Sequence, residues 1–251
     1  MKNNELLDIS IDAAILGGKQ IMDVYAGSFE VFKKEDESPL TVADQNANEV
    51  IIRELIKTNI PVLSEEGRSI PYSERKDWDR LWIVDPLDGT KEFVKRNGEF
   101  TVNIALIENG EPILGVIYVP VTKVLYYASE EGAFKKIDNI ITQLPIENNK
   151  ENFVAVGSRS HQSEETKEYF NNLSKKYGNV DIVSMGSSLK ICLVAEGIAD
   201  VYPRFAPTME WDIAAGHAIV KHAGKKLIDY KTKKEMIYNR KNLLNNWFIV
   251  S

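Results

Sequence analysis

The first part of the chain repeats its hydrophobic positions with the period of an amphipathic helix. Between residues 4 and 26 apolar side chains such as Leu7, Ile11 and Ile15 recur every three or four positions, which predicts one long helix. Apolar and polar side chains alternate over residues 29–32, which suggests a short strand. The polar run 33–38 predicts a loop. A second helix is predicted to begin at Thr41, because threonine is a preferred cap and apolar positions recur after it.

Shorter apolar runs farther along the chain predict strands. They cover residues 61–63, 81–84, 100–107, 113–119 and 124–128. The pair Asn109-Gly110 is typical of a tight hairpin, so the last three runs are expected to form an antiparallel meander. The two helices are then predicted to pack on this sheet.

The pattern changes after a polar stretch at residues 138–152, where we place a boundary between two subdomains, residues 1–145 and 146–251. The second subdomain alternates strands and helices, which is typical of an α/β fold. Its predicted strands are 153–156, 180–183, 199–202, 226–228 and 247–250, and its predicted helices are 164–177, 189–196 and 211–222.

Composition excludes some functions and favours a compartment. A net charge of −6 argues against general affinity for nucleic acid. The single cysteine, Cys192, lies in an apolar stretch, so we expect a buried structural residue and not a nucleophile, in a reducing compartment. No run has the length of a membrane span and the first residues do not resemble a signal peptide. We therefore expect a cytoplasmic protein, and leave peripheral contact with a membrane open.

Residues 82–93 contain the most closely spaced candidate functional groups. We expect the strand to stop at Asp85-Pro86, since proline lacks an amide hydrogen. Asp88-Gly89-Thr90 then predicts a turn into a helix capped near Asp88 or Thr90. Two carboxylates three residues apart can converge on Mg²⁺, and the amides of Gly89 and Thr90 can hold a phosphate. The alternative is an ordinary capped helix after a buried strand, because Asp-Pro and Asp-Gly are common in turns.

Three further carboxylates could join this site, and each has a simpler explanation. Asp44 lies in the first turn of a predicted helix, where it would compensate the helix dipole. Glu65 follows the strand at residues 61–63 and could be solvated. Asp212 lies at the start of a helix and could be a cap. If Glu65, Asp85, Asp88 and Asp212 meet, the nest needs bound cations, because bare like charges repel.

The order of the motifs decides between these alternatives. Ser64-Glu65-Glu66, then Trp82 to Thr90, then Trp211-Asp212-Ile213-Ala214-Ala215-Gly216 resembles the Mg²⁺-dependent, lithium-sensitive phosphatase superfamily that includes inositol monophosphatases and fructose-1,6-bisphosphatases. The runs 88–107, 158–161, 186–190 and 202–205 are similar to its 3′(2′),5′-bisphosphate nucleotidase branch. The resemblance implies a layered αβαβα sandwich and hydrolysis of adenosine 3′,5′-bisphosphate to AMP and phosphate. It also implies activity on 3′-phosphoadenylyl sulfate and a link to sulfur metabolism.

The resemblance also implies roles for individual residues. The implied ligands of two or three Mg²⁺ ions are Glu65, Asp85, the carbonyl of Leu87, Asp88 and Asp212. Thr90 paired with Asp44 would deprotonate the attacking water, with Glu65 assisting. The implied substrate contacts are Asp88, Gly89, Thr90, Ser158, His161, Gly186, Ser187, Lys190, Arg204 and Asp212. For Lys190 and Arg204 the alternative is ordinary surface charge, and for His161 a simple loop histidine.

Two other readings of the chain stay open. The first is an inositol or sugar monophosphatase, and the second is a nucleotide sensor without turnover, which would not need the Thr90–Asp44 pair. His217 and His222, four residues apart, suggest a metal pair only superficially, since no partner ligand is apparent. The expected partner is a small nucleotide bisphosphate, with no nucleic acid and no integral membrane segment. The sequence leaves monomer and homodimer open.

Overall fold

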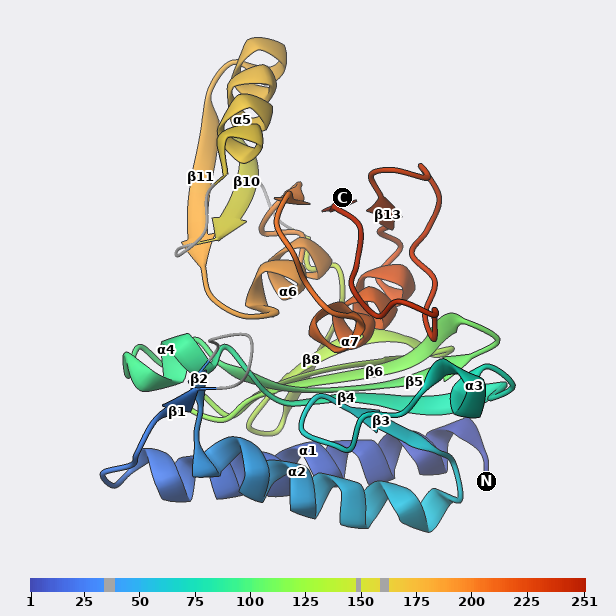
Figure 1. Cartoon of the computed structure of the whole chain (residues 1–251). Coiled ribbons are helices and arrows are strands. Elements are labelled where there is room, and N and C mark those ends of the chain that lie inside the picture. Colours follow the sequence, from blue (N-terminus) through green and yellow to red (C-terminus); the bar gives the residue numbers. More distant parts are fainter. Residues whose placement is uncertain (34–38, 148–149, 159–162) are drawn as a thin grey trace.

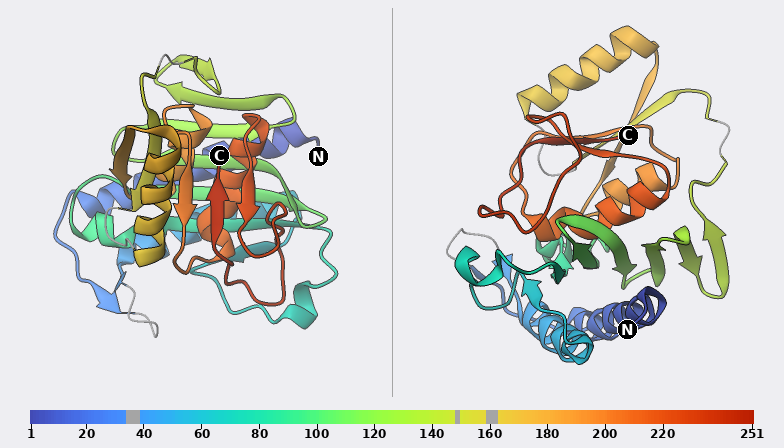
Figure 2. Two further views of the ribbon diagram at one scale, coloured as in Figure 1. Left: turned by 90° about the horizontal axis from the view of Figure 1, so that it is seen from above. Right: turned by 90° about the vertical axis from the view of Figure 1, so that its right-hand side faces the viewer.

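A computed structural model of the chain describes residues 1–33, 39–147, 150–158 and 163–251. Five layers follow one another: a helix pair, a large sheet, a second helix pair, smaller sheets and an outer helix (Figures 1 and 2). The predicted αβαβα sandwich is confirmed. Within the described residues, no helix combines the length and the apolar character needed to cross a membrane.

The first layer consists of helices α1 (Asn3–Tyr25) and α2 (Val42–Leu55), as the hydrophobic spacing predicted. Thr41 caps α2, because its hydroxyl accepts a hydrogen bond from the amide of Ala43 at 3.2 Å. Both helices bury their apolar faces against one side of the large sheet, in a core that includes Ile51 and Trp82. The strand predicted at residues 29–32 is mostly wrong, since β1 begins only at Phe32 (Phe32–Lys33) and pairs with β2 (Pro39–Leu40). Of the loop predicted at residues 33–38, Lys33 belongs instead to β1, and residues 34–38 lie outside the described residues.

The large sheet has seven strands in the order β3-β4-β5-β6-β7-β8-β9. Their bounds are β3 Val62–Ser64, β4 Arg80–Asp88, β5 Thr101–Glu108, β6 Glu111–Val119, β7 Val124–Ser129, β8 Gly132–Ile137 and β9 Ile140–Gln143. The pair β3–β4 is parallel and the remaining pairs are antiparallel, so the predicted meander is confirmed. Strand β9, the short helix α3 (Tyr72–Arg75) and the 3₁₀ turn η1 (Ile56–Thr58) were not predicted, because segments of three or four residues are too short to show a hydrophobic repeat.

Strand β4 corrects one prediction. We expected the strand to stop at Asp85-Pro86, but it continues to Asp88. The pairing with β5 shifts register between Asp85 and Asp88, so Pro86 lies in a bulge that requires no ladder hydrogen bond from its nitrogen. The bulge lets the strand carry both carboxylates to its end.

Helices α6 (Leu189–Ala195) and α7 (Glu210–His222) cover the other face of the sheet (Figure 1). α7 lies against β5 and β6. At Gly115 the contact is so close that an added Cβ would lie 2.4 Å from the carbonyl oxygen of Ala215. This second core contains side chains from both halves of the chain, including Cys192, which is buried as predicted.

The outer layers come from residues after 150. Strands β10 (Phe153–Ser158) and β11 (Val180–Met185) are parallel, and helix α5 (Glu164–Tyr177), which lies between them in sequence, packs on their outer side (Figure 1). Strands β12 (Tyr202–Arg204), β13 (Leu227–Asp229) and β14 (Phe248–Val250) form a three-stranded sheet. The strand predicted at 199–202 is displaced, because Val201 makes only an isolated bridge to Ala155 before β12 begins.

Candidate active site

The end of β4 turns sharply into the five-residue helix α4 (Thr90–Val94). The cap of this helix is Gly89, which corrects the expectation of Asp88 or Thr90. Gly89 has a φ of +91°, a left-handed conformation that glycine adopts without strain, and an added Cβ would lie 3.1 Å from the carbonyl oxygen of Glu99. The bulge and this turn together direct Asp85, Asp88 and Thr90 to one side of the sheet.

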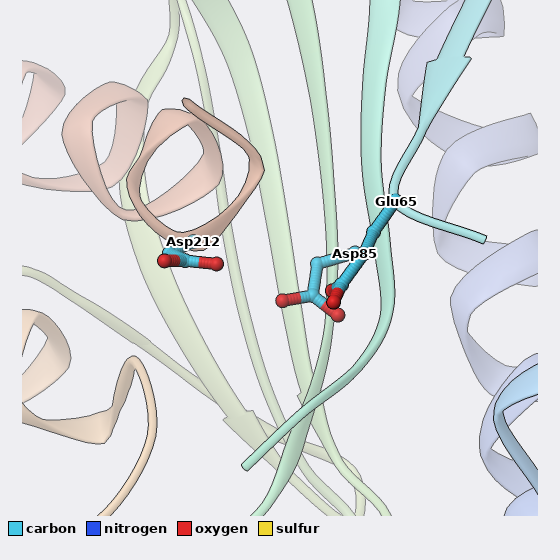
Figure 3. Close-up of side chains that lie close together, drawn as sticks. All are labelled: Glu65, Asp85 and Asp212. Carbon is cyan, nitrogen blue, oxygen red and sulfur yellow. The ribbon is translucent and has the colours of Figure 1, made fainter. Parts of the chain in front are cut away.

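Three carboxylates from distant parts of the chain meet at this point (Figure 3). Glu65, Asp85 and Asp212 each have an oxygen within 4.8 Å of the others. The parallel pairing of β3 with β4 places Glu65 beside β4, where its amide donates to the carbonyl of Val84 at 3.1 Å. Asp212 comes from the first turn of α7, where its Oδ2 also accepts a hydrogen bond from the amide of Met209 at 2.7 Å. The N-cap of α7 is therefore Met209, and Asp212, at the third helical position, accepts from the amide of that residue while it also reaches the cluster.

The electrostatics of this cluster favour a bound cation. Burial, followed by the charges of Glu65, Asp88 and Asp212, raises the pKa of the Asp85 carboxyl well above its ordinary value. Burial and the charges of Asp88 and Glu65 likewise raise the pKa of Asp212. Like charges at this spacing in a buried site repel unless a proton or a cation is present. Carboxylate oxygens are the ligands that Mg²⁺ prefers, so these residues fit a divalent magnesium site.

Asp88 lies beside the cluster and is held through one oxygen. Its Oδ2 accepts hydrogen bonds from the hydroxyl of Ser187 at 2.6 Å, and from the amide and hydroxyl of Ser188 at 2.6 and 2.8 Å. The side-chain amide of Asn103 approaches the same oxygen at 3.4 Å. In the described part of the chain, no hydrogen bond reaches Oδ1. Asp88 can therefore offer that oxygen to a cation.

Thr90 and Asp44 are in contact, as the resemblance implied. The Thr90 hydroxyl lies 3.2 Å from Asp44 Oδ1 and 3.3 Å from the carbonyl of Leu87, and its single proton can go to either oxygen. Asp44 is buried, and its Oδ2 accepts hydrogen bonds from the amide and hydroxyl of Thr41, each at 2.7 Å. The simpler explanation, that Asp44 belongs to the start of α2, is thus also correct. The same carboxylate serves the helix with one oxygen and faces Thr90 with the other.

A cleft opens next to the carboxylates. A cavity of about 170 Å³ and an adjoining one of about 410 Å³ share the lining residues Asp88, Gly89, Lys91, Glu92, Arg204 and Asp212. Glu65 and Thr90 line the larger cavity, while Gly186, Ser187 and Lys190 line the smaller one. Most of the residues expected to bind metal and substrate therefore surround one connected space.

Two basic residues give this space a cationic wall. Lys190 is buried and its ammonium donates to the carbonyls of Met185 and Ser187. Burial lowers the pKa of Lys190 from 10.5 to about 8, with Arg204 adding to the decrease and Asp88 opposing it. The guanidinium of Arg204 donates to the carbonyl of Pro207 at 3.1 Å, and its buried Nε has no hydrogen-bond partner in the described part of the chain. These are not ordinary surface charges.

The remaining histidine and serine predictions have different outcomes. His161 lies outside the described residues, and of Ser158 only the backbone is described, paired with Met185. His217 contacts the hydroxyl of Tyr238 at 2.9 Å, and burial lowers the pKa of His217 to about 3. His222 lies 3.2 Å from the carbonyl of Ile113. Each of the two rings thus has a partner of its own, and neither belongs to the carboxylate cluster.

Two residues beside the site, Ser188 and Asn103, had no role assigned from the sequence. Ser188 bonds to Asp88 and to the backbone carbonyl of Asp212, and Asn103 bonds to Ser188. Both lie inside runs that carry the resemblance, 186–190 and 88–107, so a signal was present. We predicted no role for Ser188 or Asn103, because neither serine nor asparagine is a typical magnesium ligand.

The fold and the site identify the class of protein. The sequence matches the model of the inositol monophosphatase family over residues 2–249, and the chain belongs to this family. The predicted resemblance is confirmed, and the family is metal-dependent, in keeping with the acidic cluster.

Within the family, the chain is similar to proteins named 3′(2′),5′-bisphosphate nucleotidase CysQ. It is 49% identical to the protein of this name from Salmonella typhimurium over 238 residues, 93% of this chain and 94% of the relative. It is 47% identical to the one from Escherichia coli K12 over 250 residues, 98% of this chain and 99% of the relative. The crystal structure of CysQ from Bacteroides thetaiotaomicron superposes with a TM-score of 0.90 at 51% identity, covering 98% of this chain and 96% of that one.

Proposed function

We propose that this protein is a Mg²⁺-dependent 3′(2′),5′-bisphosphate nucleotidase that hydrolyses adenosine 3′,5′-bisphosphate to AMP and phosphate. The observation that carries the proposal is the carboxylate cluster of Glu65, Asp85 and Asp212 beside a cleft with a cationic wall. Similarity to proteins named for this activity, over nearly the whole chain, supports it.

The metal-binding part of the proposal assigns two or three Mg²⁺ ions to the site. Glu65, Asp85, Asp88, Asp212 and the carbonyl of Leu87 would hold them. Bound Mg²⁺ would neutralise phosphate charge and lower the pKa of the attacking water. The buried carboxylates gain from this binding, because a cation removes the repulsion that raises the pKa values of Asp85 and Asp212.

The chain's own residues provide the path for the proton. Thr90 can transfer its hydroxyl proton to Asp44 Oδ1, 3.2 Å away, and then accept a proton from the attacking water. The hydrogen bonds from Thr41 to Asp44 Oδ2 keep that carboxylate oriented toward Thr90. The amides of Gly89 and Thr90, at the start of α4, would bind the scissile phosphate.

The cationic wall would favour a substrate with a second phosphate. Among the described residues the buried Nε of Arg204 has no hydrogen-bond partner, and Lys190 brings an ammonium into the same cavity. Arginine suits a phosphate because it can donate two parallel hydrogen bonds, and lysine acts as a point charge. We assign these two residues, with Ser187, to the phosphate that is not cleaved. Gly186, Ser158 and His161 belong to the same proposed contact set.

A substrate panel tests the proposal. Phosphate release is measured in Mg²⁺ and after EDTA, with adenosine 3′,5′-bisphosphate, adenosine 3′-monophosphate, 3′-phosphoadenylyl sulfate, fructose 1,6-bisphosphate and inositol 1-phosphate. We expect kcat/KM to be at least tenfold higher for the adenosine bisphosphate than for inositol 1-phosphate, and EDTA to abolish activity. Equal rates on inositol 1-phosphate would instead assign an inositol or sugar monophosphatase. Tight bisphosphate binding with no hydrolysis in Mg²⁺ would assign a sensor.

A further inference from the structure

Ser188 occupies the N-cap position of α6 but does not cap the helix with its side chain. It is the residue before α6, where a serine normally caps the helix with its side chain. Its φ of −68° and ψ of −5° are helical, and its side chain makes no capping hydrogen bond. The residue is nevertheless 4% exposed, so its hydroxyl needs partners elsewhere.

Those partners are two of the proposed metal ligands. The Ser188 hydroxyl lies 2.8 Å from Asp88 Oδ2 and 2.7 Å from the backbone carbonyl of Asp212, and the Ser188 amide donates to Asp88 Oδ2 at 2.6 Å. Asp88 ends β4, whereas Asp212 lies in the first turn of α7. Ser188 thereby connects ligands that are 124 residues apart in sequence through one side chain.

The hydroxyl is itself oriented. The side-chain amide of Asn103 donates to the Ser188 oxygen at 3.0 Å, which occupies one lone pair and leaves the hydroxyl proton for Asp88 Oδ2 or the carbonyl of Asp212. The single hydroxyl proton is shared between the two acceptors or alternates between them. In either case the Ser188 oxygen stays in contact with both the end of β4 and the start of α7. All of the hydrogen bonds between Ser188 and Asp88 end on Oδ2, which leaves Oδ1 for a cation.

We propose that Ser188 is a positioning residue that holds Asp88 and Asp212 at the spacing a divalent cation requires. The inference rests on the metal site of the proposed function, but not on which phosphate ester is hydrolysed. Residues behind metal ligands that fix their orientation typically change metal affinity or activity 10- to 100-fold when they are removed.

Metal binding, measured without substrate, tests this role. The metal-free full chain is titrated with Mn²⁺, as a spectroscopic substitute for Mg²⁺, and free Mn²⁺ is followed by electron paramagnetic resonance. We expect Ser188→Ala to raise the Kd about tenfold and Ser188→Thr, which keeps the hydroxyl, to restore most of the affinity. Ser10→Ala is the matched control, because Ser10 is also a buried serine, and within the described residues its hydroxyl bonds only to the carbonyl of Leu7 in α1.

A second comparison separates the connection from simple support of Asp88. Ser187 donates to Asp88 Oδ2 but has no hydrogen bond to Asp212, so Ser187→Ala should weaken Mn²⁺ binding less than Ser188→Ala. Equal weakening would overturn the proposed connection. At saturating Mg²⁺, Ser188→Ala should regain most of its kcat with an unchanged KM for the nucleotide.

The outcomes distinguish this inference from the proposed function. Wild-type Mn²⁺ affinity in Ser188→Ala overturns the inference even if the chain is a nucleotidase. Failure of the wild-type protein to bind Mn²⁺ overturns the metal site itself. If Ser188→Ala lowers the melting temperature so far that it unfolds, Ser188→Cys is used, because a thiol fills the space but donates only weak hydrogen bonds. Unchanged affinity in a folded Ser188→Cys would equally refute the role.

Discussion

Lys190 should make the preference for the bisphosphate depend on pH. Burial lowers its pKa to about 8, so the ammonium is about 90% protonated at pH 7 and about 10% at pH 9. The charge is needed only by a substrate with a second phosphate. We therefore expect kcat/KM for adenosine 3′,5′-bisphosphate, divided by that for adenosine 3′-monophosphate, to fall about tenfold from pH 7 to pH 9.

The ratio isolates this one group. A pH effect on the hydrolytic step itself affects both substrates alike and cancels in the ratio. Both phosphate groups are already dianionic above about pH 7, since their second pKa is about 6. The sign follows from the charge: as pH rises through 8, Lys190 becomes neutral and loses its attraction for the phosphate.

The assay measures initial rates of phosphate release from the two nucleotides between pH 6.5 and 9.5 at saturating Mg²⁺. Lys190→Met is the control, because it removes the charge and roughly keeps the length of the side chain. Its ratio should be low and independent of pH. A flat profile in the wild-type protein, or a tenfold decrease that persists in Lys190→Met, would refute the assignment of Lys190 to the second phosphate.

Three other predictions follow from the site and the core. Asp88→Asn should lower kcat by at least a hundredfold in steady-state assays, because it removes a carboxylate ligand, while the circular dichroism spectrum is unchanged; near-normal activity would remove Asp88 from the metal site. Gly115→Ala should cost about 1–3 kcal/mol in urea unfolding, since the added Cβ would lie 2.4 Å from the carbonyl of Ala215, and wild-type stability would show that α7 moves away freely. Li⁺ should inhibit the enzyme by competing at a Mg²⁺ position, and insensitivity across a Li⁺ titration would argue against the proposed metal arrangement.

Much of the fold follows from local patterns in the chain. The 3.6-residue repeat predicted α1, and Thr41 marked the start of α2, because these signals depend on side chains close in sequence. Asn109-Gly110 marked the hairpin between β5 and β6 for the same reason. Local rules failed at Pro86, since a bulge in the pairing with β5, a tertiary feature, let β4 continue.

The sequence by itself also determined the family, because Ser64-Glu65-Glu66, residues 82–90 and 211–216 occur in a characteristic order. Only the tertiary structure decided which groups meet. Glu65, Asp85 and Asp212 are brought within 4.8 Å of one another by the pairing of β3 with β4 and the packing of α7 on the sheet. The lowered pKa of Lys190 likewise depends on burial, and the role inferred for Ser188 depends on Asp88 and Asn103, which are 100 and 85 residues away; no local pattern contains either.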